Sequence, residues 1–254
     1  MLPMAGEGNR FRAVGINTPK PLLDLGGLRM FELVLTNLVN HNVRSVTLVA
    51  RKEFCLKAEI PILERKFGRP FQVIEVDKTT GGPAESVLFA EPIIETSGPV
   101  VIANSDQFVE FDVNIFYSAL LGGSISGAIL TMQDSDPKWS YVQIDEGGNA
   151  VRVVEKEVVS DQATVGIYGF ANAGEMFSAI SDMNRANDRV SGELYLAPSY
   201  NYLSRARGPV QVVDLGPVGH VMHGLGTPLD LNAFLANGRA AVFIEDAKRR
   251  MVSE

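Results

Sequence analysis

Short apolar runs alternate with amphipathic stretches through the first half of this chain, and this alternation restricts its fold more than any other feature. The apolar runs are rich in β-branched residues and lie at residues 45–50, 71–76 and 99–103. The stretches with helical periodicity lie at residues 30–40, 52–67 and 84–94, and Pro61 is expected to kink or divide the second of them. Strands joined by helices of this length form right-handed crossovers, so we expect a mostly parallel sheet with helices on both faces.

After about residue 125 the pattern becomes denser in strands. Short β-type runs follow at residues 127–132, 141–144, 151–154, 164–171 and 210–214. A Glu-Gly-Gly-Asn turn at residues 146–149 joins two of them, because glycine and asparagine tolerate a positive φ. Helices are expected at residues 173–184, at 193–204, and from 229 to the end. The sheet is therefore expected to become mixed, with a small β-rich region in the second half.

Composition limits both the number of domains and the classes of partner. A chain of 254 residues with 46% hydrophobic residues can bury a large core, and we expect a single domain over residues 1–254. Its net charge of −7 argues against nucleic acid and anionic membranes as partners, since both require a basic face. Any anionic ligand must therefore be met by a local group of cations.

The cysteine content and the absence of long apolar segments indicate a compartment. Cys55 is the only cysteine, which excludes an intrachain disulfide and a cysteine-based structural zinc site. No run approaches about eighteen consecutive apolar residues, and the N-terminus lacks the pattern of a signal peptide. We therefore expect a cytoplasmic protein.

A glycine-bearing turn followed by two cations opens the chain. Residues 3–11 read Pro-Met-Ala-Gly-Glu-Gly-Asn-Arg-Phe, and residues 18–23 read Thr-Pro-Lys-Pro-Leu-Leu. Gly6 and Gly8 allow backbone N–H groups to approach an anion closely. Arg10 can then bind two phosphate oxygens at once, while Lys20 supplies a compact charge. The segment therefore suits a polyphosphate.

Other interpretations of the glycine turn remain to be weighed. A glycine pair alone is also typical of a tight βα turn that binds no ligand. A dinucleotide-binding loop would need a third glycine where Phe11 stands, and a Walker A loop would need a Gly-Lys-Ser/Thr sequence that is absent.

Since only two residues precede the turn, we expect either that the chain begins inside its first strand or that residues precede Met1.

Together, residues 6–11 and 18–23 resemble the sugar-phosphate nucleotidylyltransferase family, also called nucleoside-diphosphate-sugar pyrophosphorylases. The resemblance implies a single-domain α/β, Rossmann-like (GT-A-like) nucleotidyltransferase fold. It implies a nucleotide-binding half over about residues 1–125 and an acceptor-binding half over about residues 126–254, which contains the β-rich region. It also implies that the glycine loop, with Ala5, Gly6 and Gly8, cradles the nucleoside triphosphate. Arg10 would then bind the departing pyrophosphate, and Lys20 the phosphates on the reacting side.

Two further segments extend the resemblance on the nucleotide side. Residues 81–86, Gly-Gly-Pro-Ala-Glu-Ser, look like the family's base-binding segment, which assigns nucleotide binding to Gly82, Pro83 and Ala84; an ordinary helix N-terminus is the alternative. Residues 104–106, Asn-Ser-Asp, resemble the family's Asn-Gly-Asp, whose aspartate binds Mg²⁺. A carboxylate at the end of a parallel strand is well placed for this, although Asp106 as a mere turn residue is the alternative.

The acceptor side rests on shorter matches. Residues 154–156, Val-Glu-Lys, and residues 166–168, Gly-Ile-Tyr, look like the family's acceptor-binding elements. They imply acceptor roles for Glu155, Lys156, Gly166 and Tyr168, with a strand-edge charge pair as the alternative for the first two. Residues 192–195, Gly-Glu-Leu-Tyr, resemble a further acceptor-side stretch. The Lys-Trp-Ser-Tyr sequence at residues 138–141 adds Trp139 and Tyr141, where Trp139 forms either a pocket wall or part of the core.

The chain departs from the family pattern at one position of the expected metal site. The family commonly has Asp-x-Gly-Thr-Pro near the C-terminus, but residues 224–228 read Gly-Leu-Gly-Thr-Pro. The second carboxylate ligand is therefore missing, and Asp106 alone would contribute to the metal, which Mg²⁺ tolerates when phosphate oxygens and water complete its shell. The neighbouring His223 is a poor Mg²⁺ ligand and is expected to be a partly exposed loop residue.

The sequence thus predicts an enzyme that transfers a nucleotidyl group from a nucleoside triphosphate to a phosphorylated small molecule. The resemblance to a bacterial capsule and surface-polysaccharide branch, with members like cytidylyltransferases, favours CTP or UTP as the donor and a sugar or non-sugar acceptor. A non-catalytic nucleotide-binding module and a glycosyltransferase of the same fold remain as alternatives. The latter would use an Asp-x-Asp metal motif, and Asp134-Ser135-Asp136 has that spelling but comes a strand too late. The nucleobase, the acceptor and the oligomeric state, including a homo-oligomer, stay open.

Overall fold

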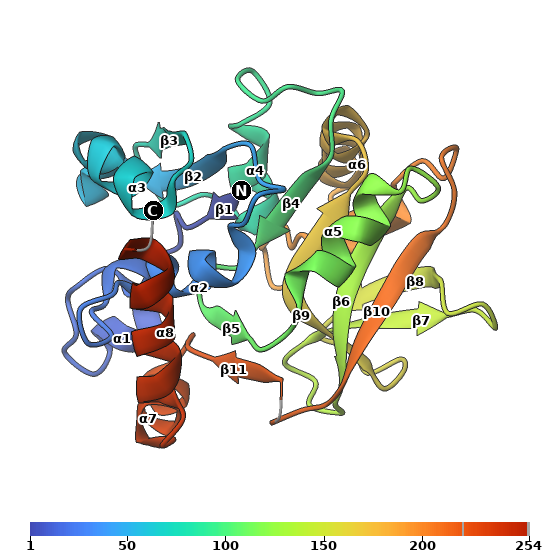
Figure 1. The fold of residues 1–254 in the computed structure, drawn as a ribbon. Coiled ribbons are helices and arrows are strands. Elements are labelled where there is room, and N and C mark those ends of the chain that lie inside the picture. Colours follow the sequence, from blue (N-terminus) through green and yellow to red (C-terminus); the bar gives the residue numbers. More distant parts are fainter. Residues whose placement is uncertain (220, 253–254) are drawn as a thin grey trace. The chain divides into compact units, whose positions relative to one another are not determined.

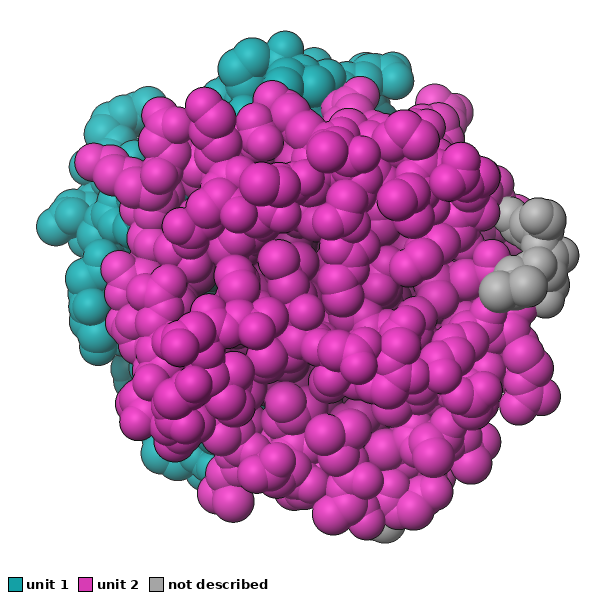
Figure 2. All heavy atoms as spheres, turned by 90° about the vertical axis from the view of Figure 1, so that its left-hand side faces the viewer, with its two compact units in different colours: residues 1, 80–103, 112–221 teal, residues 2–79, 104–111, 222–254 magenta. Residues whose placement is uncertain are grey.

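A computed structural model of the chain describes residues 1–219 and 221–252 (Figure 1). The chain divides into two compact units, each drawn from separate parts of the sequence (Figure 2). Unit 1 comprises Met1, Thr80–Ala103 and Asp112–Val221, and unit 2 comprises Leu2–Thr79, Asn104–Phe111 and Met222–Glu254. These units do not follow the expected division near residue 125, because the C-terminal segment belongs to the same unit as the glycine turn. The single domain stays a prediction.

Unit 2 contains a parallel sheet in the strand order β1 (Leu2–Pro3), β2 (Val46–Arg51), β3 (Phe71–Val76). The register pairs Leu2 with Leu48 and Val46 with Phe71. Each residue of β2 is buried, which fits its mainly apolar run and its place between two neighbours. The helices of this unit are α1 (Asn9–Arg12), α2 (Met30–Leu38), α3 (Ile60–Phe67), α7 (Pro228–Ala236) and α8 (Ala240–Val252). The C-terminal helix α8 packs against α2, α3 and α7 (Figure 1).

A short antiparallel pair completes unit 2. Strand β5 (Gln107–Val109) pairs with β11 (Met222–Gly224), so residues more than a hundred positions apart in the sequence become neighbours. Phe108 of β5 contacts Phe234 of α7 and Phe243 of α8. The C-terminal helices are therefore attached to the strand that directly follows Asp106.

Unit 1 contains a mixed sheet in the strand order β10-β6-β9-β7-β8, with β4 also paired to β9. The pair β10–β6 is parallel, and the pairs of β9 with β4, β6 and β7 and of β7 with β8 are antiparallel. The strands are β4 (Val100–Ala103), β6 (Gly127–Gln133), β7 (Ser140–Ile144), β8 (Ala150–Glu155), β9 (Gln162–Phe170) and β10 (Val210–Pro217).

Helices cover this sheet on both faces. They are α5 (Val113–Leu121), α6 (Ala173–Arg185) and the 3₁₀ helix η4 (Ala197–Asn201), and α4 (Pro83–Leu88) packs against α6. Figure 1 shows α5 in front of the strands and α6 farther back. Helix α5 lies so close that a Cβ on Gly169 of β9 would be 2.5 Å from Leu120 Cδ1. On η4, Tyr200 donates a hydrogen bond from its hydroxyl to the carbonyl of Gly169 (2.8 Å), which fixes η4 to the sheet.

The strand predictions are confirmed to within a few residues, and so is the turn between β7 and β8. In that turn Gly148 has a φ of +77°. The expected parallel pairing holds for β1, β2 and β3, whereas β4, expected among the parallel strands, pairs antiparallel with β9 in the mixed sheet. The helix predictions at residues 30–40 and 173–184 are also confirmed. No helix is predicted at α5 and no strand at β5 or β11; the two strands have only three residues each, too few for a recognisable alternation.

Several helix predictions need correction. The stretch 52–67 consists of 3₁₀ turns at Lys52–Phe54 and Leu56–Glu59 followed by α3, and Pro61 stands in the first turn of α3, where a missing N–H costs nothing. The helix expected at 84–94 ends at Leu88. The helix expected from residue 229 is divided into α7 and α8, and the last two residues of the chain lie outside the described ones.

The helix predicted over residues 193–204 is wrong. Within this fully described stretch, helical structure is limited to η4, and residues 193–196 precede it without forming a helix. The backbone groups of Leu194 bond to a distant segment: its N–H donates to the carbonyl of Gly81 (2.7 Å), and its carbonyl accepts from Ala84 N–H (3.0 Å). A helix would need those groups for itself, so the tertiary pairing overrides the local pattern.

No helix within residues 1–219 and 221–252 combines the length and the apolar character needed to cross a membrane.

Candidate functional site

In unit 2 the structure brings Lys20 and Asp106 into direct contact. Lys20 Nζ lies 2.6 Å from Asp106 Oδ2, although 86 residues separate the two in the sequence. Lys20 begins the 3₁₀ helix Lys20–Leu22, and Asp106 occupies the turn that precedes β5. Each side chain is 23% exposed, so the ion pair is reached by solvent and by ligands. A cation and a carboxylate in contact at a partly open position can exchange partners when a polyanion or a metal ion arrives.

The glycine turn packs against the root of Lys20. Gly8 has a φ of +69°, which favours glycine, and a Cβ there would lie 3.4 Å from Lys20 Cβ. Gly6 is exposed, and a Cβ on it would meet nothing within 4 Å. Arg10 lies exposed on α1, while Ala5 is buried before the turn. The turn and Lys20 are therefore neighbours, with Arg10 presented to solvent from the helix that follows.

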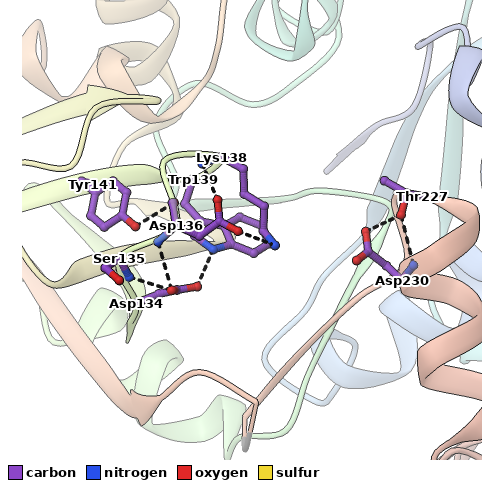
Figure 3. A network of polar contacts seen from close by, with 8 residues as sticks. All are labelled: Asp134, Ser135, Asp136, Lys138, Trp139, Tyr141, Thr227 and Asp230. Atoms are coloured by element: carbon purple, nitrogen blue, oxygen red, sulfur yellow. Dashed lines mark hydrogen bonds and ion pairs between the residues drawn. The ribbon is translucent and has the colours of Figure 1, made fainter.

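The Asp106 carboxylate lies against Gly226, two residues after the end of β11. Leu225 N–H donates to the carbonyl of Asp106 (2.8 Å), which joins the turn of Asp106 to the segment after β11. A Cβ on Gly226 would lie 2.8 Å from Asp106 Oδ2, so glycine at this position leaves room for the carboxylate. At Gly224, where the family pattern has aspartate, a Cβ would lie 3.8 Å from Asp230 Oδ2. That carboxylate accepts a hydrogen bond from Thr227 Oγ1 (2.6 Å) and helps to cap α7 (Figure 3).

His223 differs from its prediction. It belongs to β11, its side chain is 10% exposed, and its Nε2 lies 2.7 Å from Glu110 Oε1. The other oxygen of Glu110 accepts from Arg239, which precedes α8. The ring also packs near Phe234 and Phe243, with centroids 5.5 and 5.7 Å away. His223 is therefore a packed residue that ties β11 to the C-terminal helices, and not an exposed loop residue.

The side chains near Asp106 suit a metal ion only in part. Among residues 1–219 and 221–252, no group of three or more His, Cys, Asp or Glu side chains gathers as a metal site. Asp106 supplies hard carboxylate oxygens, and Gly226 leaves space beside them. Mg²⁺ commonly takes one or two carboxylates and completes its shell with substrate phosphates and water. The donor set therefore fits Mg²⁺ that arrives together with a triphosphate, with one carboxylate from the protein.

In unit 1 the segment predicted to bind the nucleobase is held by the 192–195 stretch. Gly82 has a φ of +130°, and a Cβ on it would lie 2.5 Å from both the N and the O of Leu194. Pro83 and Ala84 begin α4, and Ala84 N–H is the donor to Leu194. Arg189 reinforces the junction, since its guanidinium donates to the carbonyl of Gly81 (3.0 Å) and pairs with Glu85 (3.1 Å). The close approach of two backbones is thus the physical reason for glycine at position 82.

We expect Gly82→Ala to destabilise the protein by at least about 2 kcal/mol, because the new Cβ meets backbone atoms that cannot move aside and the residue keeps a positive φ. Gly148→Ala is the matched control: it also has a positive φ, but a Cβ there meets nothing within 4 Å. It should cost about 1 kcal/mol from the backbone alone. Urea unfolding of both variants measures the difference, and equal losses of stability would refute the steric account.

Three of the predicted acceptor residues come together where β7 and β8 meet. Ser140 pairs with Glu155 in the register, and Lys156 N–H donates to the carbonyl of Trp139 (3.0 Å). Glu155 is 7% exposed and accepts a short hydrogen bond from Ser140 Oγ. Trp139 is half-buried, and Lys156 has an exposed side chain and a φ of +57°. The chain turns at Lys156, and the two consecutive side chains point in different directions: Glu155 lies inward and Lys156 lies at the surface. Trp139, Ser140, Glu155 and Lys156 form what we call the β7–β8 corner.

The other predicted acceptor residues are buried in the same sheet. Tyr141 is fully buried, and its hydroxyl donates to the carbonyl of Asp136 (2.8 Å). Tyr168 is buried with its hydroxyl 3.0 Å from Thr164 Oγ1. Gly166 has a φ of +74° at the point where the register between β6 and β9 shifts, so it forms the bulge of β9.

Burial governs the charge of Glu155. Its pKa is raised, chiefly because burial disfavours the ionised carboxylate, with the nearby Glu193 adding to the effect. The hydrogen bond from Ser140 and the charge of Lys156 act in the opposite direction without cancelling it. Because the folded-state pKa lies above the unfolded one, ionisation of Glu155 lowers stability as pH rises through the raised pKa.

Glu155→Gln should therefore become more stable relative to the parent protein as pH increases, since glutamine keeps an acceptor for Ser140 and never ionises. The difference in unfolding free energy should be smallest near about pH 4 and largest near about pH 8. Urea titrations at the two pH values test this. A difference that does not change with pH would mean that Glu155 ionises as readily in the folded protein as in the unfolded chain.

In unit 1 the two carboxylates of the Asp-x-Asp sequence are bonded to groups of their own loop. Asp134 accepts hydrogen bonds from Ser135 N–H (2.6 Å) and from Trp139 Nε1 (2.6 Å). Asp136 accepts from Lys138 N–H (3.1 Å) and pairs with Lys138 Nζ (2.9 Å). Figure 3 shows both carboxylates turned back into this loop. They shape the loop that carries Trp139.

Comparison with known proteins now adds the family. The model of the family described as "Nucleotidyl transferase" matches residues 2–198. The chain belongs to the nucleotidyl transferase family. The curated relative "Mannose-1-phosphate guanylyltransferase catalytic subunit beta" from Drosophila melanogaster is 26% identical over 175 residues, covering 67% of this chain and 47% of the relative. The chain thus spans about half the length of the curated relatives it matches.

Solved structures share the fold of this family member. A nucleoside-diphosphate-sugar pyrophosphorylase from Vibrio cholerae RC9 superposes with a TM-score of 0.79 at 22% identity, over 92% of this chain and 99% of that one. A putative glucose-1-phosphate thymidylyltransferase from Bacillus anthracis gives a TM-score of 0.75 at 21% identity, over 94% and 93% of the two chains. These confirm the predicted Rossmann-like α/β fold, and the family model confirms the predicted family.

Sequence reasoning assigned no role to two residues at the β7–β8 corner, although both stand in motifs that resemble the acceptor side. Ser140 contacts Glu155, and Tyr195 contacts Lys156. Ser140 could have been found from the alternation of the 138–141 motif, which places it opposite the Glu of the next strand. Tyr195 lies in the 192–195 stretch that resembles an acceptor-side motif, but its contact with Lys156 could not be predicted, because 39 residues separate the two.

Proposed function

We propose that this chain transfers a nucleotidyl group from a nucleoside triphosphate to a phosphorylated small molecule and releases pyrophosphate. The observation that carries the proposal is the contact of Lys20 with Asp106 beside the glycine turn, since it gathers a phosphate-binding cation and a metal-binding carboxylate from distant parts of the chain. The relatives described above are named for nucleotidyl transfer to sugar phosphates, which supports the proposal. Because the chain spans about half of the curated relative, its own substrates need a direct test.

The donor phosphates would be handled by groups of unit 2. Arg10 is exposed on α1 and would bind the departing pyrophosphate. Lys20 would leave Asp106 for a phosphate of the reacting side, a compact charge on a flexible stem being suited to this change of partner. Bound Mg²⁺ would neutralise the charge that builds on the α-phosphate, with Asp106 as its protein ligand.

The acceptor would be handled by groups of unit 1. Lys156 supplies a surface cation for the acceptor's phosphate, and Glu155 a buried carboxylate that can accept hydroxyl protons in hydrogen bonds. Trp139, half-buried, would form a wall, while Gly82, Pro83 and Ala84 would face the nucleobase. Tyr141, Gly166 and Tyr168 would act by shaping the corner, in keeping with their burial. The acceptor phosphate, already an anion, would attack the α-phosphorus in line, so no general base is required.

The two rival functions make different demands. A glycosyltransferase would need the Asp134 and Asp136 carboxylates for a metal ion, and the bonds within their loop argue against that. A non-catalytic nucleotide-binding module is supported by glycine at position 224, which removes a metal ligand. It has less need for Arg10, Lys20 and Asp106 together, so we favour the enzyme.

A pyrophosphate-release screen tests the proposal. The four ribonucleoside triphosphates and dTTP would each be combined with phosphorylated sugars, cholines and amino acids, with and without Mg²⁺. We expect release that depends on one donor, on one class of acceptor and on Mg²⁺, with CTP or UTP as the preferred donor. Nucleotide binding without turnover across the whole panel would favour the binding module.

The setting of the reaction also remains a proposal. We infer a cytoplasmic enzyme of capsule or surface-polysaccharide synthesis, from the motif resemblance and the composition alone. Sedimentation of the purified protein would determine whether it forms a homo-oligomer.

A further inference from the structure

In unit 1 the ammonium of Lys156 donates its hydrogen bond to an aromatic residue, while its charge also acts on the neighbouring Glu155. Its Nζ donates a short hydrogen bond to the hydroxyl of Tyr195, and it lies 4.4 Å from the centroid of the same ring. The Lys156 backbone is fixed as well, by its φ of +57° and its bond to Trp139. Both ends of a long, flexible side chain are therefore constrained.

The chemistry of the partner matters for what Lys156 can still do. A carboxylate partner would neutralise the ammonium, as happens between Lys66 and the buried Glu32 (2.7 Å). A phenol hydroxyl is a neutral acceptor, and the ring attracts the cation only through its quadrupole. Tyr195 thus holds Lys156 in place while its positive charge remains available to an anion.

The support under Tyr195 is rigid. The preceding residue, Leu194, is fully buried and bonds through its N–H and its carbonyl to Gly81 and Ala84. Arg189 also donates to the carbonyl of Gly192 (3.3 Å). The backbone of the segment that carries Tyr195 is therefore held by hydrogen bonds at Gly192 and at Leu194.

From these contacts we infer that Tyr195 is a positioning residue: it sets Lys156 toward the phosphate of the acceptor. The inference rests on the proposed function, in which Lys156 binds that phosphate. Tyr195 itself touches no reacting atom, and its effect passes through Lys156.

The test is a double-mutant cycle on the acceptor. Tyr195→Phe keeps the ring and removes the hydroxyl, so kcat/KM for the acceptor should fall by about five- to tenfold while the KM for the nucleoside triphosphate is unchanged. In the Lys156→Met background the same substitution should have no further effect on kcat/KM for the acceptor. Tyr202→Phe is the matched control, because it removes a phenol hydroxyl bonded to Asp188 (3.1 Å) in the same unit. It should leave both parameters unchanged.

Two kinetic results would overturn the inference: an equal loss in both lysine backgrounds, or no loss from Tyr195→Phe at all. A second readout needs no turnover. In protein whose lysines carry ¹³C-methyl groups, the Lys156 signal, identified by its loss in Lys156→Met, should shift in Tyr195→Phe and not in Tyr202→Phe. An unmoved signal would refute the positioning role, whereas a wild-type protein without turnover would refute the proposed function and leave this signal to decide on Tyr195.

Discussion

Replacing Lys20 with methionine should lower the rate of pyrophosphate release by about 10²- to 10³-fold, the loss expected when a fixed group that stabilises transition-state charge is removed. Methionine keeps most of the length of lysine, so packing against Gly8 is preserved while the charge is lost. The fold should survive, because a partly exposed ion pair such as Lys20 with Asp106 contributes less than about 1 kcal/mol to stability. Steady-state kinetics and urea unfolding of the same preparation measure the two effects.

Lys57→Met provides the matched control for this substitution. Lys57 also lies in unit 2 and also pairs with a carboxylate, that of Glu75 at 3.0 Å, but it carries none of the predicted roles. We expect near-normal turnover from this control. Turnover of Lys20→Met within about threefold of the parent would contradict the role of Lys20 in charge stabilisation.

Asp106→Asn should lower kcat by about 10³-fold and also raise the Mg²⁺ concentration needed for half-maximal rate by about tenfold. Asparagine is nearly the same size and stays clear of Gly226, but it lacks the charge that attracts a divalent cation. Lys20→Met, in contrast, should leave the Mg²⁺ requirement nearly unchanged. The two substitutions touch one contact, so their combined effect should be smaller than the product of the separate effects.

Binding of Mn²⁺ in the presence of nucleotide, followed by electron paramagnetic resonance, gives a readout for Asp106 that does not depend on turnover. We expect weaker Mn²⁺ binding in Asp106→Asn and unchanged binding in Glu75→Gln, which removes a carboxylate elsewhere in unit 2. Unchanged Mn²⁺ binding in Asp106→Asn would remove Asp106 from the metal site, whatever its effect on the rate.

Local pattern predicted most of the strands, because a buried strand leaves a compact apolar signature. The run at Val46–Arg51 is buried along its whole length and appears in the sequence as a mainly apolar, β-branched segment that contains Thr47 and ends in an arginine. The helix expected over residues 193–204 failed for the opposite reason. There the backbone of Leu194 bonds to Gly81 and Ala84, and no property of the local residues encodes a partner more than a hundred positions away.

The residues of the candidate site could be predicted where they belong to a sequence motif, but the contacts between distant residues could not. Lys20 and Asp106 were both chosen from motif resemblance, but their contact depends on how the chain folds between them. The burial of His223 could not be foreseen, because its partner Glu110 stands 113 residues earlier. Tyr195 belongs to a stretch that resembles an acceptor-side motif, but the sequence does not show that its hydroxyl contacts Lys156.

The most direct test of the account follows the α-phosphate of the donor. A nucleoside triphosphate labelled at the α-phosphorus would be incubated with Mg²⁺ and the acceptor selected by the screen. We expect the label to pass into a product joined to the acceptor and unlabelled pyrophosphate to form in equal amount. Lys20→Met and Asp106→Asn should yield almost none of either product. Label that stays in the triphosphate despite binding, or that leaves as nucleoside diphosphate with orthophosphate, would contradict nucleotidyl transfer.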